Sequence, residues 1–360
     1  MASPTALQIL WFGVIGLLWI YYFFLEGFDF GVGMLLPFLA RDDIERRMVI
    51  RSIGPVWDGN EVWLIFAGGA IFAAFPLWYA TLFSGFYIPL LLILLGLIVR
   101  GVAFEVRNQR EDPSWRHRWD WLTFTGSLLP AVLWGVAFAD IVQGVPLNAA
   151  HQVTGTLLDL LNPYGLLGGL TFGLLFLLHG ATYLCLKLTG PLGERAHTVA
   201  TRLAWPVTVV VLAFLTYTFV NALTAGDSGV VPGPIPLAAI SLVGVSAVLL
   251  QARYHGWAFI CTGGAIALLV VTIFLNLYPR VLASSTNTAY SLTIANSSAS
   301  QYSLTLITIF TAIFLPVVVL YQAWTYWVFR ERVTHEQFEL PKILQKKTLP
   351  EQPHSAPDDA

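Results

Sequence analysis

Four carboxylates in this sequence of 360 residues lie in or beside apolar segments, in two pairs with the same spacing. Glu26 and Asp29 are three residues apart, and so are Asp58 and Glu61. Residues three apart share one face of a helix, so each pair predicts two acids that project in the same direction. Acids that cluster in an apolar setting are suited to exchanging protons in the physiological pH range. These residue types and spacings therefore indicate a hydrated, acidic entry for protons.

Each of these acids also has a structural interpretation. Asp58 is placed to cap the N-terminus of the helix that follows it, where a carboxylate is favourable. Glu26 and Asp29 would then pair with an arginine: Arg47, Arg51 or Arg100. Arg100 ends an apolar run, so it either extends to the membrane interface or serves as the charge partner of the acids. A charge at membrane depth is costly, and each one is therefore a functional hypothesis.

Three further side chains lie inside apolar runs. His179 is either an axial haem ligand or a hydrogen-bonded residue of a helix bundle, and the absence of a second ligand favours the bundle. Cys185 and Cys261 are expected to be small packing residues. The sequence contains no Cys-x-x-Cys pair, no phosphate-binding glycine loop with Lys and no His-Glu-x-x-His motif. We therefore expect no catalytic residue and no metal site on this chain, and any reactive cofactor is expected on another chain.

The composition excludes a soluble protein. Hydrophobic residues make up 56% of the chain and charged residues 11%, with a mean hydropathy of +0.70. The formal net charge is -2 and the basic residues stand at the ends of apolar runs, so no nucleic-acid partner is expected. Lipid is the expected surrounding.

Apolar runs of membrane-spanning length predict an all-α integral membrane protein. Nine spans are expected: Ile9 to Leu39, Glu61 to Leu82, Phe86 to Val106, Trp121 to Val142, Tyr164 to Leu188, Leu203 to Leu223, Ile235 to Gln251, Trp257 to Leu277, and Leu304 to Phe329.

The connections between these spans alternate in charge. The first, third, fifth and seventh connections and the C-terminal segment carry Lys or Arg, whereas the second, fourth and sixth carry none and the eighth has only Arg280. The positive-inside rule then places the N-terminus outside and the C-terminus in the cytoplasm. Residues 1–333 are expected to form the transmembrane domain. Residues 334–360 are expected to be a cytoplasmic tail that is disordered from about residue 345, where apolar residues become rare.

Taken in order, several segments resemble subunit II of the cytochrome bd-type quinol oxidases along nearly the whole chain. The resemblance rests on ordered blocks of sequence: Glu26-Gly27-Phe28-Asp29-Phe30-Gly31-Val32-Gly33-Met34, Gly54-Pro55-Val56-Trp57-Asp58-Gly59-Asn60-Glu61-Val62-Trp63-Leu64, Gly68-Gly69-Ala70-Ile71-Phe72-Ala73-Ala74-Phe75-Pro76, Leu161-Asn162-Pro163-Tyr164-Gly165-Leu166, and His179-Gly180-Ala181-Thr182-Tyr183-Leu184. The segment after Val333 has no counterpart in this resemblance, so nothing is carried to it.

The resemblance implies a bacterial inner-membrane complex with a larger subunit I. Subunit I would carry haems of b and d type and the quinol site, and the complex would oxidise quinol and reduce dioxygen to water, generating a proton-motive force without pumping. Subunit II would have nine helices in two four-helix bundles plus one extra helix. It would support subunit I and contribute to a cytoplasmic proton path, whose aspartate matches Asp58. The resemblance leaves open a structural quinone and additional small single-span subunits.

Two rival functions follow from the same residues. A secondary transporter would use intramembrane acids to couple ions to a substrate. A purely structural subunit would contain the acids without a proton path. Uptake of substrate by the chain alone would favour the transporter, and normal turnover after all four acids are neutralised would favour the structural subunit.

Overall fold

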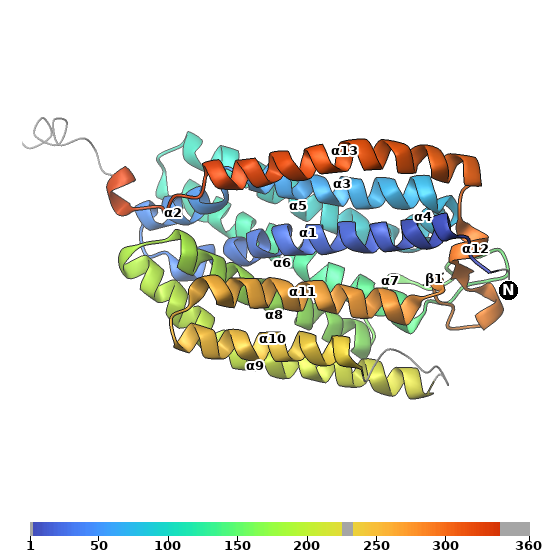
Figure 1. Ribbon diagram of the computed structural model, residues 1–360. Helices are drawn as coiled ribbons and strands as arrows, with labels where there is room; N and C mark the ends of the chain where they lie inside the picture. The colour runs from blue at the N-terminus through green and yellow to red at the C-terminus, as the bar shows by residue number, and fades with distance from the viewer. Residues whose placement is uncertain (1–2, 225–232, 339–360) are drawn as a thin grey trace, which may run out of the picture.

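Long α-helices that run side by side form most of the chain (Figure 1). The computed structural model describes residues 3–224 and 233–338. Within those residues, eight helices are long and apolar enough to cross a membrane: α1 (Ala6–Leu39), α5 (Tyr87–Val106), α6 (Pro113–Gln143), α8 (Pro163–Lys187), α9 (Gly190–Thr224), α10 (Pro234–Gln251), α11 (His255–Leu277) and α13 (Gln301–Val328). The prediction of an all-α integral membrane protein is confirmed.

The predicted span from Glu61 to Leu82 is not a single helix. It is divided between α3 (Trp57–Ala74) and α4 (Pro76–Gly85), with Phe75 in a non-helical conformation between them. Pro76 has no N–H to continue the ladder of α3, but it suits the first position of a new helix. The two helices follow one another beneath α13, along the length of the molecule (Figure 1).

The helices form two groups of four, with one helix outside. The first group contains α1, the α3–α4 pair, α5 and α6, and the second contains α8, α9, α10 and α11. The groups meet where α8 packs along α1 and α6, while α13 lies against α3 and α1 at the edge of the first group (Figure 1). Among the described residues, these contacts are consistent with the two bundles and extra helix that the resemblance implied.

Small residues permit the close approach of α1 and α8. A Cβ on Gly31 would lie 2.1 Å from the carbonyl oxygen of Phe176 and 2.7 Å from Cα of Gly180. A Cβ on Gly33 would lie 2.0 Å from the hydroxyl of Ser127 on α6. The backbones therefore touch where Gly is present, as in other membrane bundles.

Short elements close the two ends. The end that contains α2 (Asp43–Ile53) also holds η1 (Arg107–Gln109) and η3 (His335–Phe338), and the N-terminus lies at the other end (Figure 1). That second end holds the remaining short elements: α7 (Leu157–Leu160), β1 (Arg280–Leu282), η2 (Thr288–Tyr290), β2 (Leu292–Thr293) and α12 (Ile294–Ser297). Strands β1 and β2 pair antiparallel, with Arg280 opposite Thr293. The predicted disorder from about residue 345 lies outside the described residues.

Ion pairs fix α2 to the bundles at the first of these ends. The buried guanidinium of Arg107 donates to Asp120 of α6 at 2.6 Å and to Asp43 of α2 at 2.9 Å. Glu45 of α2 pairs with Arg195 of α9 at 2.5 Å. The short helix α2 therefore bridges the two groups.

Candidate functional site

The acids Glu26 and Asp29 lie in the interior of the first group of helices. Both are in α1, three residues apart, and both are fully buried. Their spacing puts them on one side of α1, as expected from helix geometry. Side chains of α3 and α5 meet them there.

Arg100 of α5 is the charge partner of two acids. One terminal nitrogen of its guanidinium donates to the Glu26 carboxylate and also to the Glu61 carboxylate, the latter at 2.5 Å. Its side chain is fully buried, and its guanidinium carbon lies 4.8 Å from the centre of the Phe30 ring. The structure therefore places Arg100 against the acids and not at the membrane interface.

Asp29 is held by an amide and not by an arginine. The Asn60 side-chain N–H donates to Asp29 at 2.6 Å. The Asn60 carbonyl oxygen in turn accepts from the Gln322 amide at 2.9 Å and from the Tyr326 hydroxyl at 2.8 Å, both on α13. A polar chain thus runs from Asp29 in the C-terminal third of α1 through α3 to α13.

This cluster contains more acid than base. Glu26, Asp29 and Glu61 face the single guanidinium of Arg100 among the described residues of the cluster. One oxygen of Glu26, one oxygen of Asp29 and two nitrogens of Arg100 are buried without a hydrogen-bond partner. Such groups are costly in a low-dielectric interior unless a proton or water satisfies them. The cluster is therefore able to hold and exchange protons.

Asp58 is not part of the buried cluster. It is exposed in the first turn of α3, where its charge is favourable to the helix dipole. It makes no capping hydrogen bond, because Val56 is the cap residue. Glu61 follows one turn later and keeps 22% of its side chain exposed. The two acids therefore form a step from the surface toward Arg100.

Both ring nitrogens of His179 make hydrogen bonds, one to α1 in the first group and one to α11 in the second. Nε2 lies 3.1 Å from the carbonyl oxygen of Phe24, which can only accept, so this nitrogen donates in the neutral ring. Nδ1 lies 2.7 Å from the Thr262 hydroxyl, and the ring stacks on Phe259 at 4.4 Å. Neither nitrogen is free for a haem iron, and the structure favours the bundle interpretation of His179.

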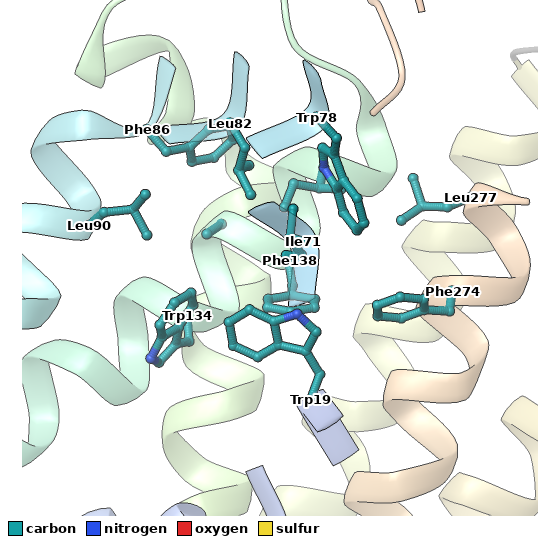
Figure 2. A pocket seen from close by; sticks show the side chains of 12 residues that line it. Trp19, Ile71, Trp78, Leu82, Phe86, Leu90, Trp134, Phe138, Phe274 and Leu277 are labelled. Atoms are coloured by element: carbon teal, nitrogen blue, oxygen red, sulfur yellow. The ribbon is translucent and has the colours of Figure 1, made fainter. Parts of the chain in front are cut away.

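An apolar pocket lies between α1, α4, α6 and α11. Figure 2 shows Trp19, Trp134 and Phe138 on one side and Trp78, Phe274 and Leu277 on the others. The indole N–H of Trp78 is buried without an acceptor. This pocket is separate from the acidic cluster.

Three members of the polar chain were not predicted from the sequence. Asn60 is uncharged and stands between the acids Asp58 and Glu61. Gln322 and Tyr326 are four residues apart on α13 and so share a face of the helix. A polar pair at that spacing in an apolar helix was the signal available.

Three comparisons with known proteins point to one family. The family described as cytochrome bd terminal oxidase subunit II matches residues 7–329. Cytochrome bd ubiquinol oxidase subunit 2 of Bacillus subtilis (strain 168) is 42% identical over 333 residues, which cover 92% of this chain and 98% of that protein. Cytochrome bd-I ubiquinol oxidase subunit 2 of Escherichia coli (strain K12) is 36% identical over 373 residues, covering 94% and 98%. A chain in the structure of bd oxidase from Geobacillus thermodenitrificans superposes with a TM-score of 0.71 at 20% identity, covering 90% of this chain and 99% of that chain, and supports the fold.

Proposed function

The chain belongs to the cytochrome bd terminal oxidase subunit II family, and we propose that it supports a haem-bearing subunit I and supplies protons to it from the cytoplasm. The chain is an inner-membrane protein and a member of a quinol oxidase complex. In the proposed complex, subunit I oxidises quinol and reduces dioxygen to water. Protons drawn from the cytoplasm for that reduction energise the membrane without a pump.

The haems of b and d type are assigned to subunit I. His179 lies within a spanning helix, and hydrogen bonds engage both of its nitrogens. Haem iron needs a free nitrogen or sulfur ligand, so this residue does not fit the group. The pocket in Figure 2 has a volume of about 20 Å³ and an entirely apolar lining, so it does not fit a structural quinone.

One observation carries the proposed proton path: an exposed acid, a partly exposed acid and a buried acid follow one another. Asp58 is exposed, Glu61 lies one turn further along α3, and Arg100 connects Glu61 to Glu26. Residues three apart on a helix are neighbours, so a water can join the first two carboxylates. We assign proton uptake to Asp58 and relay to Glu61.

The buried acids set the charge of the relay. Glu26 competes with Glu61 for the same nitrogen of Arg100, so a proton on one acid strengthens the pairing of the other. Asp29 is the acid without a cationic partner in the described cluster and holds a proton or water beside Asn60. Both therefore belong to the proposed path as groups that tune Glu61.

We propose that partner subunits or lipid contact the exposed apolar faces of the outer helices. Helix α13 has one buried residue, Leu304, and exposes large apolar side chains such as Phe310, Phe314 and Trp324. Helix α5 exposes a further row of apolar side chains. Such faces are stable against lipid or against the spans of subunit I and of small accessory subunits.

The experiment is to replace Asp58 and Glu61 by their amides, singly and together, in the purified complex. Asp58→Asn and Glu61→Gln keep the side-chain shape and remove the titrating proton. We expect a normal haem spectrum with quinol-dependent oxygen uptake lowered about tenfold or more, in the range that loss of a proton-transfer group produces. Glu111→Gln is the matched control, because Glu111 is an exposed acid in the connection between α5 and α6.

Full turnover in the doubly neutralised complex would contradict the proton path and leave a structural subunit. Slow turnover that Glu111→Gln also produces would show a general effect of surface charge. Failure of the complex to assemble is separated from slow turnover by the haem spectrum, which reports subunit I directly.

A further inference from the structure

Three potential metal ligands meet in the second group of helices, at the same end of the molecule as α2. Cys185 lies in the last turn of α8, His197 in the second turn of α9, and His255 at the first residue of α11. Their ligand atoms, one sulfur and two ring nitrogens, all lie within 4.8 Å of one another. The connections between the helices, and not the sequence spacing, bring these residues together.

The two imidazoles already face each other. Nε2 of His255 lies 3.1 Å from Nδ1 of His197, so one of these nitrogens donates a proton to the other. The Cys185 thiol is buried and donates to the carbonyl oxygen of Ala181 at 3.2 Å. In a tetrahedral zinc site, bonds of about 2.0 to 2.3 Å put ligand atoms about 3.3 to 3.8 Å apart. The nitrogen pair is therefore close to the spacing that a zinc ion requires, and the sulfur needs to move by about an ångström.

We propose that Cys185, His197 and His255 bind Zn²⁺ with water in the fourth position. One thiolate and two neutral imidazoles are ligands that zinc prefers over magnesium or calcium. Binding releases the thiol proton. The histidine that donates in the pair takes the tautomer with its proton on the other ring nitrogen, so both ligand nitrogens are free for the cation. The site goes beyond the proposed proton path, because none of its residues contacts the acidic cluster.

The surroundings suit a cation that carries a thiolate. Glu194 stands one turn before His197 on α9, and it balances Arg253 by two contacts of 2.9 Å. Arg332, from the segment after α13, donates to the carbonyl oxygens of Cys185 and Leu186 at 2.9 Å. A zinc ion would thus tie α8, α9 and α11 together where the segment after α13 is also attached. Its proposed role is to brace this end of the second group.

The first test is the zinc content of the complete complex, purified in mild detergent, stripped with a chelator and then returned to Zn²⁺. We expect the wild-type complex to retain about one zinc more per complex than the His197→Gln/His255→Gln variant, by elemental analysis. His117→Gln, which changes an exposed histidine near the start of α6, is the control and should retain the same zinc as wild type. Equal zinc in all three complexes would overturn the proposal.

X-ray absorption at the zinc edge identifies the zinc ligands in the wild-type complex itself, so this test does not depend on whether a variant folds. The wild-type complex should show one sulfur at about 2.3 Å and nitrogen or oxygen at about 2.0 Å. Cys185→Ser should lose the sulfur shell, and Cys261→Ser, which changes the other cysteine, should keep it. A bound zinc without sulfur in the wild-type complex would also overturn the proposal. These readouts do not involve turnover, so they stand apart from any failure of the proton path.

Discussion

Arg100 is the residue on which the buried cluster depends most. Removal of its charge would leave Glu26 and Glu61 facing each other without a cation, and loss of one partner of a buried ion pair costs about 3 to 5 kcal/mol. We expect Arg100→Gln to lower the yield and thermal stability of the complex. Adding Glu26→Gln should recover part of the loss, because it removes the uncompensated acid. Arg118→Gln, at an exposed arginine, is the control.

Thermal unfolding of the detergent-solubilised complex measures this directly. Equal melting temperatures for wild type and Arg100→Gln would contradict the account of the cluster. An additive effect of the two substitutions would show that Glu26 and Arg100 are energetically independent.

For single residues, the sequence predicted which helix face carries the acids, but it did not predict how exposed each acid is. The spacing of Glu26 and Asp29 put both on one helix face, which the structure shows. The exposure of Asp58 did not follow from the spacing, because a residue at a helix start is covered only if other elements pass over it, and spacing within the helix does not report that. Cys185 was interpreted as a packing residue, since its histidine neighbours lie on other helices.

Among the elements, the contact between α1 and α8 depends on the absence of a side chain at Gly31. A methyl group there would meet backbone atoms that cannot move without separating the helices. Overpacking typically costs about 1 to 3 kcal/mol, and a clash with backbone is at the upper end or beyond. We expect Gly31→Ala to prevent assembly or to lower the melting temperature strongly.

Gly13→Ala in the same helix is the matched control. No atom lies within 4 Å of a Cβ at Gly13, and Ala favours a helix over Gly by about 1 kcal/mol in soluble hosts. This variant should assemble like wild type. Equal behaviour of the two variants in size-exclusion chromatography and thermal unfolding would rule out the close contact.

The stability that Glu45 contributes by fixing α2 to the bundles is predicted to depend on pH. Burial raises the pKa of Glu45, but hydrogen bonds from the Arg195 side chain and the Arg41 backbone N–H outweigh burial, so its pKa lies below the usual value. A lowered pKa means that the stabilisation is present above the ordinary pKa of about 4.3 and is lost as pH falls through the lowered value. Wild type should therefore exceed Glu45→Gln in melting temperature at pH 6, and the difference should shrink as the pH falls below about 4.3. A difference that is constant with pH would contradict the ion pair.

The division of α3 from α4 was within reach of the sequence. Pro76 follows fifteen residues after Glu61 in the predicted span, and a proline inside a helical pattern breaks or kinks it. The predicted span continued through Pro76 because the residues on both sides of it are apolar. Each of the other eight predicted spans coincides with one long apolar helix. Four of these helices continue through an interior proline: Pro37, Pro130, Pro206 and Pro316.

For the whole molecule, the fold class followed from composition and apolar runs, and the grouping of the helices followed from the resemblance to a family. Apolar periodicity could not supply the grouping, since lipid-facing and helix-facing residues are equally apolar in a membrane. The exposed faces of α13 and α5 have the same ambiguity, which only a partner chain or lipid removes.

The most direct measurement is to purify the chain in mild detergent from its native membrane and record the reduced-minus-oxidised visible spectrum together with quinol-dependent oxygen uptake. The account predicts a larger subunit that co-purifies, absorption bands of haems b and d, and oxygen uptake that falls when Asp58 is replaced by Asn. A colourless chain without a partner and without oxygen uptake would contradict it.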